Sequence, residues 1–207
     1  MSLRSRLIKH KLLIATTNKG KAREFRALFK GLPLSVFTLS DLGSFTPFEE
    51  KGDSFLDIAS GKSLFYNDRW KDHILGEDSG LEIDFLEGAP GIYSARFSGL
   101  NADDEKNIRK VLSLMKNAPS DKRQARFISC MVLSKKGKVL KAIEEFALGS
   151  ILQEKKGTGG FGYDPIFYYP PLEKTFAQLD PEIKNQVSHR GKAFKILKDY
   201  IKENILD

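Results

Sequence analysis

The stretch QARFISCMVLSKKGKVLKAIEEFALGSIL, residues 124–152, decides the fold class. Residues 124–134 and 138–152 are long runs rich in apolar residues, and the segment SKKGK between them has the composition of a short turn. Two such runs on either side of a turn are typical of paired antiparallel strands. The sequence therefore predicts a long β-hairpin in the second half of the chain.

Upstream of the hairpin, strand-like and helix-like segments alternate. The apolar residues of 53–67 recur on one helical face, which predicts that Phe65 faces the core, and Asp53 or Ser54 is suited to cap this helix. The expected strands are residues 12–16, 34–38, 73–76 and 81–86 together with the hairpin, and the expected helices are residues 20–31, 53–67, 101–117 and 192–206. This order predicts an α/β fold with a mixed sheet.

The length and composition of the chain favour one domain with two lobes. The chain has 207 residues, of which 41% are hydrophobic, and this is near the upper limit of what one core covers. It contains no internal repeat, no low-complexity tract and no clear linker. We expect a basic N-terminal extension, residues 1–11, followed by a single two-lobed domain, residues 12–207.

The charge and the cysteine content limit the partners and the compartment. A formal net charge of +7 favours nucleotides, nucleic acid or an anionic membrane surface without choosing among them. The single cysteine, Cys130, excludes an intrachain disulfide and favours a reducing compartment. No apolar stretch is long enough for a signal-peptide core or a membrane span. We expect a soluble cytoplasmic protein without a membrane partner; a short organellar presequence at the basic N-terminus is the alternative.

The segment TTNKGK, residues 16–21, joins an expected strand to an expected helix. Free backbone N–H groups and the helix dipole attract anions at such a point, and Lys21 adds a cation, so the segment is a candidate phosphate site. It does not match the Walker A pattern, because Ala22 stands where Ser or Thr is required. The alternative interpretation is an ordinary capped helix start with a solvated lysine.

Adjacent acids, Glu77 and Asp78, follow the apolar segment 73–76, and we interpret them as the end of a strand. Carboxylates at a strand end are suitable ligands for Mg²⁺, which takes one or two of them together with water and phosphate oxygens. Glu49 and Glu50 are candidates for a further ligand. Acidic turn residues without a metal are the alternative.

Three further segments are rich in turn residues or hydrogen-bond donors. In KGTGGFGYDP, residues 156–165, glycines surround Phe161, which favours a flat aromatic ligand, and Asp164 before a proline is expected to be extended. The alternative is a flexible loop with Phe161 in the core. The other two segments are GAPGIYSAR, residues 88–96, which is a tight loop carrying Ser94, and SHRG, residues 188–191, which is a donor-rich loop before the last helix or simply its solvated cap.

Two common kinds of catalytic site are disfavoured. A Ser-His-Asp triad is disfavoured because the chain lacks a G-x-S-x-G elbow. A zinc site is disfavoured because the chain lacks a second cysteine and any paired histidines.

Five segments together resemble the inosine triphosphate pyrophosphatase family, whose members are also called dITP/XTP diphosphatases. They are ATTNKGKAREF (15–25), EDSGLEIDFLEGAPGIYSARFSG (77–99), GTGGFGYDPIF (157–167), KTFAQL (174–179) and SHRGKA (188–193). The resemblance covers residues 12–200. It implies an elongated, twisted mixed β-sheet flanked by helices, with two lobes, an active site in the cleft between them and a homodimer. It also implies Mg²⁺-dependent hydrolysis of purine nucleoside triphosphates such as ITP, dITP and XTP to the monophosphate and pyrophosphate.

The resemblance assigns roles to residues that match the family motifs. Asp78 matches the catalytic acid, and Glu50 and Asp78 match the metal ligands. The triphosphate-binding residues it implies are Thr16, Thr17, Asn18, Lys19, Gly20, Lys21, Lys62 and Ser79. The base-binding residues it implies are Phe161, Gly162, Tyr163, Asp164, Lys184, His189 and Arg190. No nucleic-acid partner is expected.

The sequence departs from the family pattern at two places. Glu77 replaces the first acid of the usual Asp-Asp pair, and Asp57-Ile58-Ala59 replaces Glu-Asn-Ala. An apolar Ile58 cannot make the hydrogen bonds of an amide, so the surroundings of Glu50 and Lys62 are expected to differ. Two alternatives to the main interpretation stay open. One is a related pyrophosphatase that prefers other nucleotides, such as pyrimidines, and the other is a non-catalytic nucleotide or nucleic-acid binder.

Overall fold

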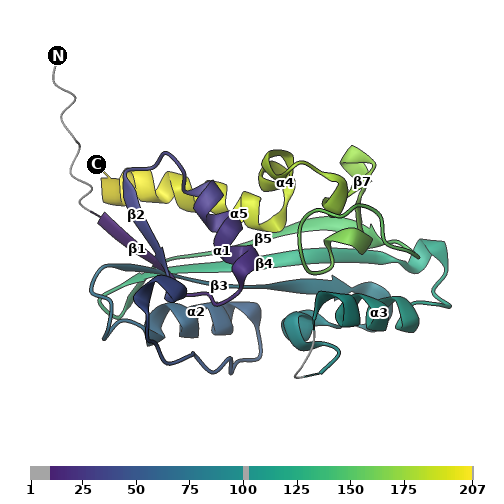
Figure 1. The fold of residues 1–207 in the computed structure, drawn as a ribbon, viewed down its shortest axis with the longest axis horizontal. Helices are drawn as coiled ribbons and strands as arrows, with labels where there is room; N and C mark the ends of the chain where they lie inside the picture. The colour runs from purple at the N-terminus through teal and green to yellow at the C-terminus, as the bar shows by residue number, and fades with distance from the viewer. Residues whose placement is uncertain (1–9, 100–102, 207) are drawn as a thin grey trace, which may run out of the picture. The chain divides into compact units, whose positions relative to one another are not determined.

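The computed structural model describes residues 10–99 and 103–206 (Figure 1). Within them, seven strands form one sheet in the order β2-β1-β3-β4-β5-β6-β7. Strand β1 is parallel to β2 and β3, whereas β6 is antiparallel to β5 and β7, so the predicted mixed α/β sheet is confirmed. Most of the predicted extension, residues 1–9, and the start of the expected helix 101–117 lie outside the described residues.

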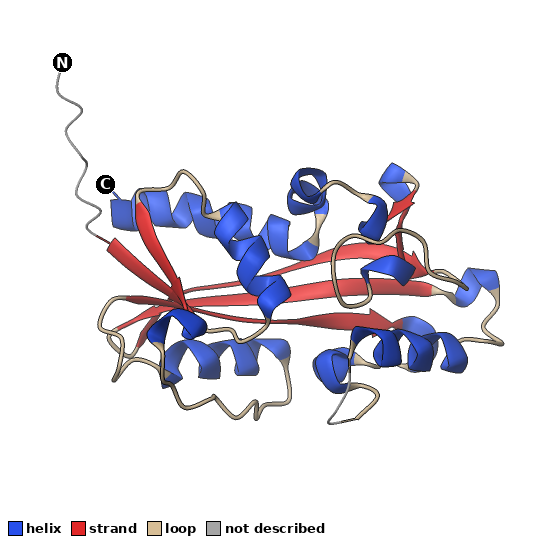
Figure 2. Ribbon diagram, viewed as in Figure 1, coloured by secondary structure: helices blue, strands red, loops and turns tan. Residues whose placement is uncertain are grey.

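The predicted elements occur in the predicted order, except that one strand, β3, replaces two expected strands, and β6 and β7 were not predicted. Figure 2 shows the helices in blue and the strands in red. The strands are β1 (His10–Ile14), β2 (Leu34–Thr38), β3 (His73–Ile83), β4 (Gln124–Lys135), β5 (Lys138–Ile151), β6 (Phe167–Tyr169) and β7 (Lys174–Thr175). The α-helices are α1 (Lys19–Leu28), α2 (Phe55–Phe65), α3 (Asp104–Leu114), α4 (Pro181–Val187) and α5 (His189–Ile201). The predicted hairpin is confirmed, and Lys136 and Gly137 at its turn both have the positive φ that tight two-residue hairpin loops require.

The chain folds into two compact units, and neither is a continuous segment. The first unit contains the residues up to Glu77, then Cys130–Ile143, then the residues from Phe194 onward. The second unit contains Asp78–Ser129 and Glu144–Ala193. Strands β3, β4 and β5 therefore each begin in one unit and end in the other.

In the first unit, helices cover both faces of the sheet. Helices α1 and α5 lie on one face, where the rings of Phe29 and Phe194 meet edge to face with centroids 4.8 Å apart, and α2 lies on the other face (Figure 1). Ser54 caps α2 by accepting a hydrogen bond from the backbone of Asp57. Phe65, which we expected in the core, is 46% exposed, because the buried face of α2 is formed by Phe55, Ile58, Ala59, Lys62 and Ser63.

In the second unit, α3 lies on one face of the sheet and α4 on the other (Figure 1). A continuous apolar core joins the sheet to the elements around it. Its members include Leu81 from β3, Val111 from α3, Phe127 from β4 and Phe167 from β6. This core also anchors the glycine-rich segment, since Tyr163 is one of its buried members.

Strand β3 differs from the prediction, which placed two strands around the adjacent acids. The structure has one strand, His73–Ile83, and Glu77 and Asp78 lie in its middle and not at its end. The glycine before them, Gly76, allows α2 to approach the strand closely, because a Cβ at this position would collide with the helix backbone. Gly76 is therefore required by packing, and our interpretation of the acids as the end of a strand is wrong.

Candidate active site

The predicted phosphate turn is an ordered helix start in the first unit. Asn18 is the N-cap of α1, and its side-chain oxygen accepts a hydrogen bond of 3.0 Å from the backbone N–H of Lys21. Thr16 in turn accepts a hydrogen bond of 3.2 Å from the backbone of Asn18. Thr17, Asn18 and Lys19 are exposed, so the turn is open to solvent. This geometry suits an anion at the positive end of the helix dipole.

A cluster of two lysines and two carboxylates also lies in the first unit. The ammonium group of Lys21 is 2.9 Å from the carboxylate of Glu77, whose side chain is fully buried. The ammonium group of Lys62 is 2.5 Å from the carboxylate of Glu50 and donates a hydrogen bond of 3.4 Å to the backbone carbonyl of Glu77. The structure therefore places Lys21, Lys62, Glu50 and Glu77 together.

The candidate catalytic acid, Asp78, is the residue at which β3 enters the second unit. It is 6% exposed, and the preceding Glu77 is 1% exposed, so both acids are buried. Buried carboxylates are stable only with charged or hydrogen-bonding partners, and they are commoner at functional sites than elsewhere. The pair is therefore a strong candidate for part of an active site.

The carboxylates have the chemistry that Mg²⁺ requires. This ion takes one or two carboxylates and completes its octahedron with water and phosphate oxygens. Glu50, with its side chain 35% exposed in the first unit, and Asp78, in the second unit, each carry a carboxylate of this kind. Among residues 10–99 and 103–206, no group of three or more His, Cys, Asp or Glu side chains is placed to hold a metal by itself. The chemistry of each carboxylate fits an ion that needs few protein ligands and a phosphate substrate.

The glycine-rich segment of the second unit presents Phe161 as a partly buried ring. The ammonium group of Lys184 lies 4.9 Å from the centre of this ring, and the guanidinium group of Arg190 lies 5.6 Å from it. The alternative interpretation, with Phe161 inside the core, is wrong, because Phe161 is neither fully buried nor a member of the apolar core of this unit. An aromatic ring with two cations beside it is suited to a flat, polar heterocycle.

Asp164 holds the glycine-rich segment in place. Its carboxylate accepts a hydrogen bond of 2.8 Å from the backbone of Phe161 and pairs with Lys184 at 2.5 Å. Both side chains of this ion pair are buried. Asp164 is the first residue of a 3₁₀ turn, Asp164–Ile166, so our expectation of an extended conformation is wrong. Pro165 lies at the start of that turn, where its missing N–H is not needed.

His189 and Arg190 form the first turn of α5, and our interpretation of SHRG as a loop is wrong. Ser188 accepts a hydrogen bond of 3.1 Å from the backbone of Gly191 and so caps the helix. The ring of His189 stacks on that of Phe127 with centroids 4.7 Å apart. The helix thus fixes both predicted base-binding residues.

Ser79, which we expected to bind the triphosphate, contacts a predicted base-binding residue. Arg190, which is 2% exposed, donates a hydrogen bond of 2.8 Å to the hydroxyl of Ser79. The second unit therefore brings together Ser79, Phe161, Asp164, Lys184 and Arg190.

Two of the predicted features have purely structural contacts. Ser94 accepts a hydrogen bond from the backbone of Leu81 and donates one to the carbonyl of Gly91, so the segment 88–96 is a structural turn. Ile58, at the second departure from the family pattern, is fully buried in α2. Lys62 still forms its ion pair with the carboxylate of Glu50 despite this apolar residue.

Sequence reasoning missed Asp104, which lies at the start of α3. Its carboxylate accepts a hydrogen bond of 2.7 Å from the backbone of Gly162, next to Phe161. Burial, with a smaller contribution from Asp104, raises the pKa of Tyr163 above its usual value, and its hydroxyl donates to the carbonyl of Ser94 at 2.8 Å. An acid at a helix start is ordinarily explained by the helix dipole, so the sequence carried no sign of this contact.

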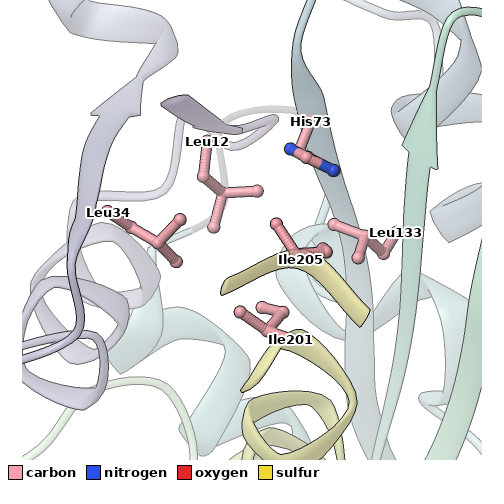
Figure 3. Close-up of a pocket in the computed structure, with 6 residues that line it drawn as sticks. All are labelled: Leu12, Leu34, His73, Leu133, Ile201 and Ile205. Carbon is pink, nitrogen blue, oxygen red and sulfur yellow. The ribbon is translucent and has the colours of Figure 1, made fainter. Parts of the chain in front are cut away.

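An apolar recess in the first unit is lined by other residues (Figure 3). They are Leu12, Leu34, His73, Leu133, Ile201 and Ile205. Figure 3 shows aliphatic side chains from several elements converging there, with His73 as the one polar member of the six. The recess offers little that could bind a phosphate or a metal.

In the described part of the chain, no helix has the length and apolar character needed to cross a bilayer.

Comparison with known proteins gives relatives over nearly the whole chain. A dITP/XTP pyrophosphatase from Desulforamulus reducens is 46% identical over 89% of this chain and 92% of the relative. A dITP/XTP pyrophosphatase from Caldanaerobacter subterraneus is 42% identical over 92% of this chain and 96% of the relative.

Solved structures have the same fold. The Ham1 protein of Staphylococcus aureus matches with a TM-score of 0.82 and 38% identity, covering 93% of this chain and 98% of that one. A HAM1 protein from Coxiella burnetii also matches with a TM-score of 0.82, at 33% identity, covering 94% of this chain and 99% of that one. The model of the Ham1 family matches residues 12–200, which include both residue clusters. The chain therefore belongs to the Ham1 family.

Proposed function

We propose that this protein hydrolyses purine nucleoside triphosphates with a deaminated base, namely ITP, dITP and XTP, to the monophosphate and pyrophosphate. Such an enzyme removes these nucleotides before a polymerase can use them. The observation that carries the proposal is the arrangement in the second unit, where Phe161 has the cations of Lys184 and Arg190 beside its ring. The activity in the names of relatives at 46% and 42% identity supports it.

The first unit would bind the triphosphate. Lys21 and Lys62 would neutralise the charge that develops on the departing pyrophosphate. Because carboxylates already hold both ammonium groups, little reorganisation is needed when the phosphates arrive. Backbone N–H groups at the start of α1 would bind phosphate oxygens directly. The residues of this turn are Thr16, Thr17, Asn18, Lys19 and Gly20.

The carboxylate of Asp78 would be the catalytic group of the reaction, and it would hold Mg²⁺ together with Glu50. A bound Mg²⁺ would polarise the phosphoryl oxygens and offset their charge. The carboxylate of Asp78 would orient the attacking water and accept its proton. Its place inside a long strand supports this role, because a strand fixes a carboxylate more rigidly than a loop does.

Base selection would rest on hydrogen-bond donors in the second unit. Stacking on Phe161 tolerates any purine, and Gly162 and Tyr163 hold that ring in place. Adenine presents an amino group where hypoxanthine and xanthine have a 6-keto oxygen, which would leave a buried donor unpaired at a cost of about 1–3 kcal/mol. Guanine shares the 6-keto group, so its rejection would depend on its 2-amino group. The candidate donors are Lys184, His189 and Arg190.

A substrate panel tests the proposed function. The protein is incubated with Mg²⁺ and ITP, XTP, GTP, ATP, TTP or UTP, and the products are separated and identified. Turnover of ITP and XTP to the monophosphate and pyrophosphate is expected. Release of orthophosphate would refute the position of cleavage, and preference for TTP or UTP would refute the purine assignment. Absence of hydrolysis, together with salt-sensitive binding to oligonucleotides, would refute the proposal that the protein is an enzyme.

We further propose a cytoplasmic homodimer. Cys130 is a buried cysteine outside any disulfide, as suits a reducing compartment. Phe146 and Leu148 of β5 are 44% and 61% exposed, and apolar side chains of this size are commonly covered by a partner chain. Light scattering of the purified protein checks the oligomeric state, and a monomer at every concentration tested would contradict it.

A further inference from the structure

Glu77 is contacted by both of the candidate phosphate-binding lysines. Its carboxylate lies 2.9 Å from the ammonium group of Lys21, and its backbone carbonyl accepts the hydrogen bond from Lys62 at 3.4 Å. These lysines come from different helices, Lys21 from the first turn of α1 and Lys62 from the last turn of α2. All these contacts lie within the first unit.

We infer that Glu77 is a positioning residue, which fixes the ammonium group of Lys21 where the phosphate chain has to meet it. The inference rests on the proposed function, because it assigns a reason for an ion pair beside a triphosphate site. Glu77 itself would not contact the substrate, since its side chain is fully buried. Its effect on the reaction passes through Lys21.

The physical argument begins with the cost of burying charge. A carboxylate without exposure is stable only when a cation and hydrogen bonds compensate it, so the pair restrains both partners. The side chain of Lys21 is 12% exposed, whereas that of Glu77 is 0% exposed, so of the two only Lys21 is reachable from solvent. An ammonium group has three donors, so it can keep Glu77 and still donate to a phosphate oxygen.

The two lysines should respond differently to changes at Glu77. Lys62 is held by the carboxylate of Glu50 and by a backbone carbonyl, and a change of side chain at position 77 removes neither contact. Lys21 is held by the side chain itself. Substitution of Glu77 therefore removes the ion pair of Lys21 and leaves these two contacts of Lys62, and the effect on each lysine can be measured without any turnover.

The Glu77 carboxylate also opposes substrate binding in the ground state. Its negative charge lies beside the lysine that would receive a phosphate, so removing it makes the surroundings more positive. The affinity for a triphosphate should then stay the same or increase. The rate of the chemical step should fall, because Lys21 is no longer held in one place and a misplacement of about 1 Å costs on the order of 10²-fold in rate.

The experiment compares Glu77→Gln with Glu77→Asp and uses Glu82→Gln as the matched control. Glu82 is on the same strand and also forms an ion pair, at 2.8 Å with Arg126, so the chemical change is the same. The first two readouts are kcat with ITP and Mg²⁺ and the Kd of α,β-methylene-ITP, which cannot be cleaved between the α- and β-phosphates. The third is the rate at which an amine-modifying reagent labels Lys21 and Lys62, followed by mass spectrometry.

We expect Glu77→Gln to lower kcat by about 10- to 100-fold while the Kd of the analogue is unchanged or lower. Labelling of Lys21 should become faster, and labelling of Lys62 should not change. Glu77→Asp keeps the charge on an arm one methylene shorter, so it should lie between the wild type and Glu77→Gln in both kcat and labelling. Glu82→Gln should match the wild type.

Several results would overturn the inference. It fails if Glu77→Gln turns over ITP like the wild type, if kcat falls together with a proportional loss of affinity, or if both lysines become equally reactive. Thermal unfolding checks that the variants are folded. Should Glu77→Gln not fold, Glu77→Asp against Glu82→Asp carries the test, and equal kcat and Lys21 labelling in these two would refute it. A wild-type protein without turnover of any nucleotide would instead refute the proposed function.

Discussion

Arg190 donates a hydrogen bond of 2.8 Å to the hydroxyl of Ser79, and this contact joins strand β3 to the first turn of α5 within the second unit. Arg190 is buried and lies beside the ring of Phe161. Ser79 was expected to contact the triphosphate. Its bond to Arg190 connects it to the proposed recognition of the base.

Ser79→Ala should therefore weaken the discrimination between bases. The change removes an acceptor of a charged donor, an interaction worth about 1.5–3 kcal/mol, so kcat/KM for ITP should fall about 10- to 100-fold. The value of kcat/KM for ATP should fall less, because the 6-amino group of adenine does not accept a hydrogen bond from Arg190. The ratio of kcat/KM for ITP to that for ATP is the measurement, and Ser79→Thr, which keeps the hydroxyl, is the control. An equal loss with both nucleotides would indicate a role toward the phosphates.

Asp78→Asn should abolish most of the turnover of ITP without unfolding the protein. The amide cannot accept the proton of the attacking water, and general acid–base groups contribute about 10²–10⁴-fold to rates. Single-turnover hydrolysis measures the loss, and circular dichroism during heating measures the fold. Asp84→Asn is the matched control, since Asp84 is exposed just beyond the end of β3. An Asp78→Asn enzyme with wild-type turnover would overturn the assignment of the catalytic acid.

Gly160→Ala should damage the base site more than a comparable change elsewhere. Gly160 has a φ of +71°, and a Cβ at this position would collide with the carboxylate of Asp164, which holds Phe161 and Lys184. The backbone strain alone costs about 1–2 kcal/mol. Gly137→Ala imposes the same strain at a φ of +74° but meets no atoms within 4 Å, and it lies in the hairpin turn of the first unit.

Both glycine variants should unfold at lower urea concentration than the wild type, and KM for ITP should rise with Gly160→Ala alone. An unchanged KM in both variants would show that the position of Asp164 does not matter for the base.

His73 should make the protein less stable as the pH falls. Burial, together with the nearby charge of Lys135, lowers the pKa of His73 below its usual 6.5, although Asp72 opposes this shift. In the unfolded chain the imidazole takes up a proton at the higher, ordinary pKa. Its contribution to stability is therefore complete above about pH 6.5 and is lost as the pH falls from there toward the lowered folded pKa.

The check on His73 is urea unfolding between about pH 7.5 and about pH 5 for the wild type and for His73→Gln, a range that spans the ordinary pKa of histidine. As the pH falls, the free energy of unfolding of the wild type should fall more steeply than that of His73→Gln. Parallel curves would show that His73, with Asp72, Lys135 and His10 around it, does not govern the acid sensitivity.

The hairpin and the order of elements could be predicted because they depend on local patterns. Strand β2 was predicted at its observed bounds, Leu34–Thr38, and Lys136-Gly137 is a strong local turn. The predicted strand end at the adjacent acids was wrong for a physical reason: Glu77 and Asp78 are buried inside β3, and acids at a strand end look the same in sequence as acids inside a strand. The start of α5 was missed although Ser188 is an ordinary N-cap residue.

The contacts of the candidate site were harder to predict than its members. Glu77 was predicted to lie at a strand end with a metal and was noted as a departure from the family pattern, yet it pairs with Lys21. The pairing depends on how α1 and β3 approach each other, and local sequence gives no indication of that. The bond from Gly162 to Asp104 joins positions 58 residues apart and was missed for the same reason.

The three separate stretches of the first unit have a consequence for how the protein is made. Its last stretch begins only at Phe194, and the ring of that residue packs on Phe29 of α1. When the residues up to Glu77 have left the ribosome, the first unit is therefore still incomplete. It can be completed only after Cys130–Ile143 and the residues from Phe194 onward have been synthesised. Folding during synthesis can finish the second unit first, and the first unit would then be completed last.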